Sequence, residues 1–298
     1  MHKFLPFENY FAPKTQGQTL ELLHHLGPEA RMLAGGTDLF VAMREKGLRT
    51  KSLIDIKGVA DLRGIASLNG SGLSIGAATP LHEIEMNPLV REVSPVLSNA
   101  VGTIGSLQVR NRGTLGGNLV NASPSADSVP ALLVLDAKVE LLSAAGSREV
   151  SLEAFFTGPG KTVMEPGEIL KRVIIPRPEP GQFSVYLKFG PRRAMDIAVV
   201  GVAVSLIFSR DRTCKEARVA LAAVAPTPLR APRTEAALAG KIDEAAIAHA
   251  AAEAMAEARP ISDVRASAEY RRHLVGVLVR RALNQVISQY QGAPLREA

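Results

Sequence analysis

Residues 30–56 carry the pattern that most restricts the fold of this chain. Residues 30–34 predict a strand, residues 39–46 predict a helix that Gly47 ends, and residues 52–56 predict a second strand. Between the first strand and the helix stand Gly35-Gly36-Thr37-Asp38, whose Thr and Asp side chains could cap the helix. A strand, a helix and a strand in this order predict a parallel βαβ unit.

The next segment mixes strands and helices and then ends at a proline cluster. The pattern predicts helices over 19–26, 80–86, 89–101 and 130–135, strands over 72–77, 138–142 and 169–175, and a loop with five glycines over 102–117. Pro176, Pro178 and Pro180 then predict the end of a sheet and a stiff linker. We therefore expect a domain boundary between residues 177 and 178.

The remaining residues predict a second unit of different character. Strands over 183–189, 198–208 and 216–224 predict an antiparallel sheet that is buried on one face. Alanine-rich helices follow from residue 234, and the longest, over 270–290, has an apolar stripe wider than one face needs. That stripe belongs either to the core or to a contact with another subunit. The expected fold class is α+β: a two-lobed domain over 1–177, with lobes of about 1–55 and 56–177, and a sheet plus helices over 178–298.

Composition excludes several classes of protein. Of the 298 residues 46% are hydrophobic, which is ample for a buried core. The net charge of +6 comes from scattered basic residues with no interleaved aromatics, so we expect no nucleic-acid partner. Cys214 is the only cysteine, which excludes an intrachain disulfide and a cysteine-ligated iron–sulfur cluster. Without a secretory pattern at the start or an apolar window of about 20 residues, we expect a cytoplasmic protein with no membrane span.

Two glycine-rich segments are candidates for a phosphate site. In residues 34–38 the glycines would let backbone N–H groups approach a phosphate at a helix N-terminus, although the same pattern is also typical of a bare tight turn. Asp38 would repel a phosphate if it faced inward, so we expect it to cap the helix or to bond a hydroxyl. Residues 113–118 and 121–127 offer glycines, hydroxyls and amides that suit a diphosphate, and Asp127 suits a ribose-like hydroxyl or a flavin N–H. The alternative is a loop that caps the helix at Pro130.

Neither segment matches a standard nucleotide-binding fingerprint. The chain lacks the G-x-x-x-x-G-K-[ST] pattern of P-loop proteins and the G-x-G-x-x-G pattern of Rossmann folds. Its six histidines show no zinc-ligand spacing, and no nucleophile elbow is present. We expect no metal site and no catalytic side chain, so any chemistry would come from a bound cofactor.

The order of these motifs resembles that of one family along the whole chain. Residues 33–39 (LAGGTDL) resemble the first FAD loop of the molybdenum hydroxylase flavoproteins, the FAD subunits or domains of xanthine dehydrogenase, carbon monoxide dehydrogenase and their relatives. Residues 103–118 resemble the second FAD loop with its approach, and residues 121–127 followed by Pro130 resemble its continuation. Residues 262–272 (SDVRASAEYRR) resemble the signature of that family's C-terminal domain.

The resemblance implies a set of residues that bind FAD. One side of the pyrophosphate and the adjacent ribityl chain would be held by the first loop: Leu33, Ala34, Gly35, Gly36, Thr37, Asp38 and Leu39. The other side would be held by Thr114, Gly117 and Asn118, with the N–H groups of Gly116 and Gly117 facing the pyrophosphate. Asn121 and Asp127 would lie nearer the flavin and the ribityl hydroxyls, Ile104 and Gly105 would line the approach, and Leu170 would offer backbone contacts. Lys188 would lie near the isoalloxazine ring unless it is a solvated lysine on a strand.

The resemblance also implies a function and partners. The chain would be the FAD subunit of a molybdenum-dependent dehydrogenase, passing electrons from 2Fe-2S clusters on a small subunit to an external acceptor. The molybdenum cofactor would lie on a large subunit, and the complex would be a dimer of heterotrimers. Two alternatives stay open: a self-contained FAD-dependent reductase, and a non-catalytic assembly protein with a vestigial flavin site.

Overall fold

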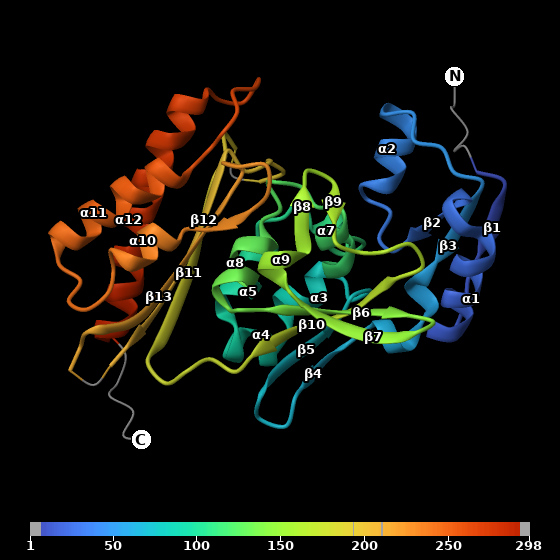
Figure 1. The fold of residues 1–298 in the computed structure, drawn as a ribbon, viewed down its shortest axis with the longest axis horizontal. Coiled ribbons are helices and arrows are strands. Elements are labelled where there is room, and N and C mark those ends of the chain that lie inside the picture. Colours follow the sequence, from blue (N-terminus) through green and yellow to red (C-terminus); the bar gives the residue numbers. More distant parts are fainter. Residues whose placement is uncertain (1–6, 193, 210, 293–298) are drawn as a thin grey trace.

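Three sheets with helices between them form the molecule in the computed structural model, which describes residues 7–192, 194–209 and 211–292 (Figure 1). The N-terminal sheet lies at one end, a five-stranded sheet lies in the middle, and the C-terminal sheet with its helices lies at the other end. A short hairpin forms a fourth sheet. The predicted α+β fold class is confirmed.

The N-terminal sheet is parallel and has the strand order β1-β3-β2. Its elements are β1 (Asn9–Phe11), α1 (Gln16–Leu26), η1 (Gly27–Glu29), β2 (Ala30–Leu33), α2 (Leu39–Glu45), β3 (Ser52–Asp55), η2 (Ile56–Gly58) and η3 (Ala60–Leu62). The predicted βαβ unit is confirmed, because β2 and β3 pair in parallel on either side of α2. The sequence did not reveal β1, since three residues are too few to show a strand period.

The middle sheet is antiparallel and has the strand order β4-β5-β10-β6-β7. Its strands are β4 (Ile65–Ser67), β5 (Gly72–Gly76), β6 (Lys138–Ser143), β7 (Gly146–Ser151) and β10 (Ile169–Pro176), and the hairpin is β8 (Phe156–Gly158) and β9 (Lys161–Thr162). Its helices are α3 (Leu81–Met86), α4 (Pro88–Val93), α5 (Pro95–Gly102), α6 (Leu107–Arg110), α7 (Leu115–Val120), α8 (Ser128–Val134) and α9 (Leu152–Phe155). The strands predicted over 72–77, 138–142 and 169–175 are therefore confirmed.

Two predictions in the middle lobe were wrong. The single helix over 89–101 is two helices, because Pro95 has no N–H to continue α4 and instead begins α5. The predicted loop over 102–117 contains α6 and the start of α7. Ser106 and Thr114 accept hydrogen bonds from the N–H groups three residues later, so these polar side chains start helices that the glycines had obscured.

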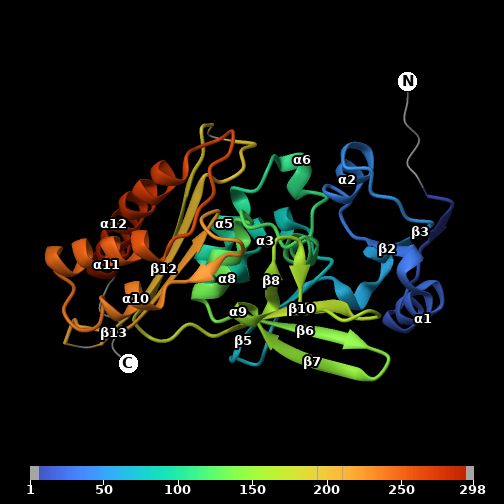
Figure 2. The ribbon, with the colours of Figure 1, turned by 45° about the horizontal axis from the view of Figure 1, so that its top comes forward.

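The C-terminal sheet is antiparallel, as predicted, but part of it is buried on both faces rather than on one. It consists of β11 (Gln182–Phe189), β12 (Val200–Phe208), β13 (Cys214–Ala222) and β14 (Leu229–Arg230), with α10 (Pro232–Ala236), α11 (Glu244–Glu257) and α12 (Ala268–Gly292). Every residue of β12 is buried. One face packs on α11 and α12, while Tyr186, Ala203 and Ala220 on the other face join the core around α8. Figure 2 shows the sheet between these two groups of helices.

The apolar stripe of α12 is part of this core. Leu274, Leu278 and Leu283 are buried in the same cluster as the residues of β12, so the core alternative accounts for the width of the stripe. Within the part of the chain that the structure describes, no helix has both the length and the apolar character that crossing a bilayer requires.

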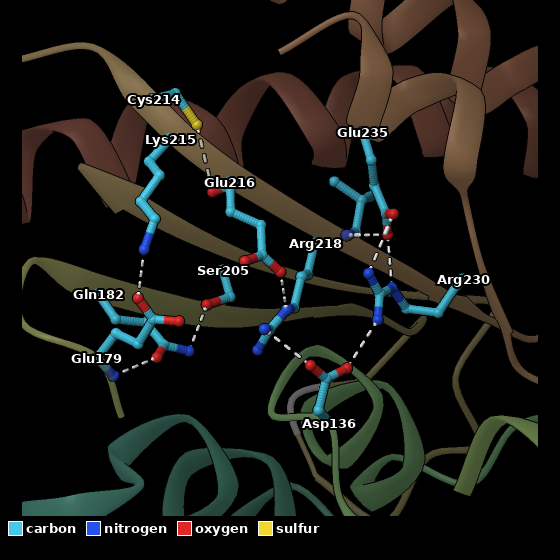
Figure 3. Close-up of polar contacts among 11 residues, drawn as sticks. Asp136, Glu179, Gln182, Ser205, Cys214, Lys215, Glu216, Arg218, Arg230 and Glu235 are labelled. Atoms are coloured by element: carbon cyan, nitrogen blue, oxygen red, sulfur yellow. Dashed lines mark hydrogen bonds and ion pairs between the residues drawn. The ribbon is translucent and has the colours of Figure 1, made fainter. Parts of the chain in front are cut away.

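Charged side chains connect the middle lobe to the C-terminal sheet (Figure 3). Asp136, in the turn after α8, lies 2.7 Å from Arg218 on β13 and 3.1 Å from Arg230 on β14. Arg230 also pairs with Glu235 of α10. Cys214 lies at the start of β13, where burial raises the pKa of its thiol to about 11.

Arg271 connects α12 to the sheet from inside the core. Its guanidinium donates to the carbonyl oxygens of Val199 (2.7 Å) and Ala223 (3.1 Å) and to the carboxylate of Asp263 (2.7 Å). Burial pushes the pKa of Asp263 upward, but the N–H of Arg265 and the Arg271 guanidinium together hold it at about 2. Asp263 and Arg271 both belong to the 262–272 motif, which therefore has a structural function at the least.

An Asp263→Asn variant should lose about 1–2 kcal/mol of stability at pH 7. A carboxyl whose pKa is lower in the folded state stabilises above its unfolded pKa, and this contribution disappears as the pH falls toward the folded value. The wild type should therefore lose stability between about pH 4 and pH 2 more steeply than the variant. Urea unfolding at several pH values measures the difference. Asp61→Asn, at an exposed position, is the control, and parallel pH profiles for wild type and Asp263→Asn would contradict the prediction.

Candidate cofactor site

The two glycine-rich segments, residues 34–38 and 113–118, touch each other in the fold although they are far apart in the sequence. Gly35 follows β2, and a Cβ on it would lie 2.2 Å from the carbonyl oxygen of Arg112 and 2.7 Å from Cα of Gly113. Real Cβ atoms do not approach main chain so closely, so only glycine permits this contact. The predicted meeting of the segments therefore depends on Gly35 as a packing position.

The first loop presents a row of unused backbone donors. The N–H groups of residues 35–39 donate no hydrogen bond to any described residue. Neither Thr37 nor Asp38 caps α2 with its side chain, so the prediction of a cap was wrong. The other alternative for Asp38 holds, because its exposed carboxylate accepts a hydrogen bond from a hydroxyl, that of Thr37, at 3.4 Å. The uncapped start of α2 can therefore bind an acceptor-only group such as a phosphate.

The second loop has fewer unused donors than the sequence suggested. The N–H of Gly116 donates to the Ala77 carbonyl at 2.8 Å, and the N–H of Gly117 donates to Thr114 Oγ1 at 3.1 Å. The expectation that these two N–H groups face a pyrophosphate was therefore wrong, because the fold already uses them. The side-chain amide of Asn118 can still donate its N–H groups to a ligand, since only its Oδ1 is used within the described part of the fold, where it accepts from Ser128 Oγ at 2.6 Å.

A second polar cluster joins Asp127 to β11. One carboxylate oxygen of Asp127 lies 2.7 Å from Nζ of Lys188, and the other accepts from the Tyr186 hydroxyl at 2.6 Å. Lys188 also donates to the carbonyl of Thr103 at 3.0 Å, directly before Ile104. Asp127, Lys188 and the 104–105 segment thus come together, and the solvated alternative for Lys188 was wrong because 11% of its side chain is exposed.

The electrostatics of this cluster follow from its burial. Burial raises the pKa of Asp127, while the Lys188 charge and the Tyr186 hydrogen bond oppose that rise. Burial and the neighbouring carboxylate raise the pKa of Tyr186 well above 10, so its hydroxyl stays a donor. Sequence reasoning missed Tyr186, although its position two residues before Lys188 places both side chains on one face of a strand.

The other predicted residues lie around the contact between the loops and around the Asp127 cluster. Leu33 and Leu170 are buried in the core, so only their main chain could reach a ligand, whereas Asn121 is exposed just after α7. Gly105 has a φ of +53°, which glycine adopts without strain. Sequence reasoning also missed Lys57, whose Nζ donates to the carbonyl of Ala34 at 3.2 Å.

The comparisons with known proteins agree along the whole chain. Residues 5–178 match the family described as the FAD binding domain in molybdopterin dehydrogenase, and residues 185–286 match the CO dehydrogenase flavoprotein C-terminal domain. The chain is 32% identical over 289 residues to the xanthine dehydrogenase FAD-binding subunit of Escherichia coli, covering 96% of this chain and 98% of that protein.

Subunits of carbon monoxide dehydrogenase are also among the similar proteins. The medium chain of the enzyme from Hydrogenophaga pseudoflava is 35% identical over 280 residues, covering 94% of this chain and 96% of that protein. A solved structure of carbon monoxide dehydrogenase from that organism, which lacks the Mo-pyranopterin moiety of the molybdenum cofactor, superimposes with a TM-score of 0.92. It covers 96% of this chain and 99% of the matched chain at 35% identity.

Proposed function

Because the chain belongs to the family of FAD-binding subunits of molybdenum-containing dehydrogenases, we infer that it binds FAD and transfers electrons within such a complex. The observation that carries this inference is the contact between the two loops. Next to this contact, the N–H groups of residues 35–39 donate no hydrogen bond to any described residue. Pyrophosphate oxygens accept hydrogen bonds and donate none, so this row of donors fits them.

The residues at the contact between the loops and the residues around Asp127 would bind different parts of the cofactor. Leu33, Ala34, Gly35, Gly36, Thr37, Asp38 and Leu39 would hold the pyrophosphate from one side. Thr114 and Asn118 would hold it from the other, where the missing side chain of Gly117 leaves room for the phosphate to approach. Asn121, Asp127, Ile104, Gly105, Leu170 and Lys188 would lie toward the flavin end. The first-loop main chain supplies the donors, while Asp127 holds the Lys188 ammonium in a nearly buried position.

FAD, when bound, supplies reversible uptake of electrons, which the side chains of this chain need not perform. The contribution of the protein is to orient the cofactor and to limit the access of water. Asp127 and Tyr186 fix the position of one positive charge at the proposed flavin end, where negative charge would be stabilised.

The proposal extends to partners and organisation. Electrons would arrive from 2Fe-2S clusters on a small subunit, fed by a molybdenum cofactor on a large subunit, and would leave to an external acceptor. A dimer of heterotrimers in the cytoplasm is the proposed assembly. Residues 1–177, in two lobes, would form the FAD-binding domain, and residues 178–298 the C-terminal domain. The family membership favours this function over a self-contained reductase or a vestigial assembly protein.

The purified protein should carry FAD that acid or heat precipitation releases, because neither loop contains a cysteine or histidine that could tether it. The native protein should also co-purify with two further subunits. Absorption spectra of the supernatant, chromatography of the released flavin and metal analysis of the native complex measure these points. Flavin that stays with the denatured chain, or FMN in place of FAD, would contradict the binding site. A fully active dehydrogenase made of this chain alone would contradict the partnership.

A further inference from the structure

We propose that Lys57 is a cofactor-positioning residue that directs the N–H of Gly35 toward the pyrophosphate; this inference rests on the proposed function. Lys57 lies in η2, outside both glycine-rich segments. Its Nζ donates to the carbonyl oxygen of Ala34 at 3.2 Å, which is the residue before Gly35.

The Lys57 ammonium is fixed by the end of β3. Its Nζ lies 2.7 Å from Asp55, and the backbone N–H of Lys57 donates to the same carboxylate at 3.0 Å. The Tyr10 hydroxyl on β1 also donates to Asp55. Two strands of the N-terminal sheet therefore hold the ammonium against the first loop.

One peptide unit transmits this contact to the loop. The carbonyl of Ala34 and the N–H of Gly35 belong to the same peptide, and in a trans peptide these groups point in opposite directions. With the carbonyl turned to Lys57, the Gly35 N–H faces away from Lys57 and donates to no described residue. A cation on the carbonyl also polarises the peptide, which makes its N–H a stronger donor.

The rest of the site increases the importance of this donor. The N–H groups of Gly116 and Gly117 are already used within the fold, so the backbone donors for the pyrophosphate come from the first loop. That loop also contains the acidic Asp38. Among the described residues, Lys57 is the cation whose side chain hydrogen bonds to the main chain of residues 33–39.

Titration of the full-length apo-protein with FAD, followed by flavin fluorescence at several salt concentrations, tests the proposal. Lys57→Met should bind FAD about 10- to 100-fold more weakly than wild type and show a smaller salt dependence, because a charge-assisted hydrogen bond and one positive charge are lost. Lys57→Arg should restore most of the affinity. Lys51→Met is the matched control, since Lys51 pairs with Glu29 in the same lobe and should not affect binding.

The outcomes separate this inference from the proposed function. Thermal unfolding of the apo-proteins reports any structural damage, and Lys57→Gln, a neutral donor, replaces Lys57→Met if the latter does not fold. Wild-type affinity and salt dependence in Lys57→Met or Lys57→Gln would overturn the role of Lys57 and leave FAD binding intact. A wild-type chain that binds no FAD would overturn both.

Discussion

Gly35→Ala is expected to purify without flavin, with an affinity for FAD at least about a thousandfold below that of wild type. The added Cβ would lie 2.2 Å from the Arg112 carbonyl oxygen, and both partners of this clash are main chain. No side-chain rotation can relieve the contact, so the two loops must separate. The residues of the two loops can then no longer contact the same pyrophosphate. The ratio of flavin to protein absorbance and an FAD titration measure the loss.

Two other glycines provide a graded comparison. Gly17→Ala, in α1 of the same lobe, should keep full affinity, because the nearest atom to its Cβ would be 3.9 Å away. Gly117→Ala should lose only part of the affinity, because its Cβ would meet a movable hydroxyl, that of Thr114, at 2.9 Å. A fully flavinated Gly35→Ala protein would show that FAD binds elsewhere.

Lys188→Met is expected to lower the free energy of unfolding by about 3–5 kcal/mol. The substitution leaves the Asp127 carboxylate buried with Tyr186 as its remaining side-chain partner. Without the ammonium the pKa of Asp127 should rise further, so the folded variant would hold an extra proton. The folded state then binds more protons than the unfolded one, and the variant should become more stable as the pH falls from 7 toward 5.

Adding Asp127→Asn to Lys188→Met removes the unpaired charge and should restore about 2–3 kcal/mol of the loss. Urea unfolding of the wild type, both single variants and the double variant gives the coupling energy directly. Lys138→Met, at an exposed pair with Glu149, controls for the loss of a lysine. Additive effects of the two substitutions would mean that the Asp127–Lys188 contact contributes little to stability.

Local patterns predicted the elements whose signal lies within a few residues. The βαβ unit over 30–56 and the strands β11, β12 and β13 were predicted because their apolar periods are continuous. The two-residue β14 was not predicted, since it is too short to show a period. Failures occurred where two local signals compete, as in residues 102–117, where glycines suggested a loop while Ser106 and Thr114 started helices. The burial of both faces of β12 depends on α8 and α12, which local pattern cannot place.

In the candidate site, too, residues with a local sequence signal were predicted and residues that depend on distant partners were not. The glycine segments could be found from sequence because glycine next to polar residues is a local signal. Lys57 and Tyr186 could not, because each acts through a partner distant in the chain, 23 residues away at Ala34 and 59 residues away at Asp127. For the same reason the sequence could not reveal that the N–H groups of Gly116 and Gly117 are already used.

The burial of Cys214 makes this protein convenient for labelling. The chain has no other cysteine, and this thiol is enclosed in the C-terminal core with a pKa of about 11. Maleimides react with exposed thiolates, so the wild type should stay unlabelled at neutral pH. A Leu107→Cys substitution, on the exposed side of α6, would then carry the only dye on the molecule, and its emission would report the approach of other subunits without any prior removal of native cysteines.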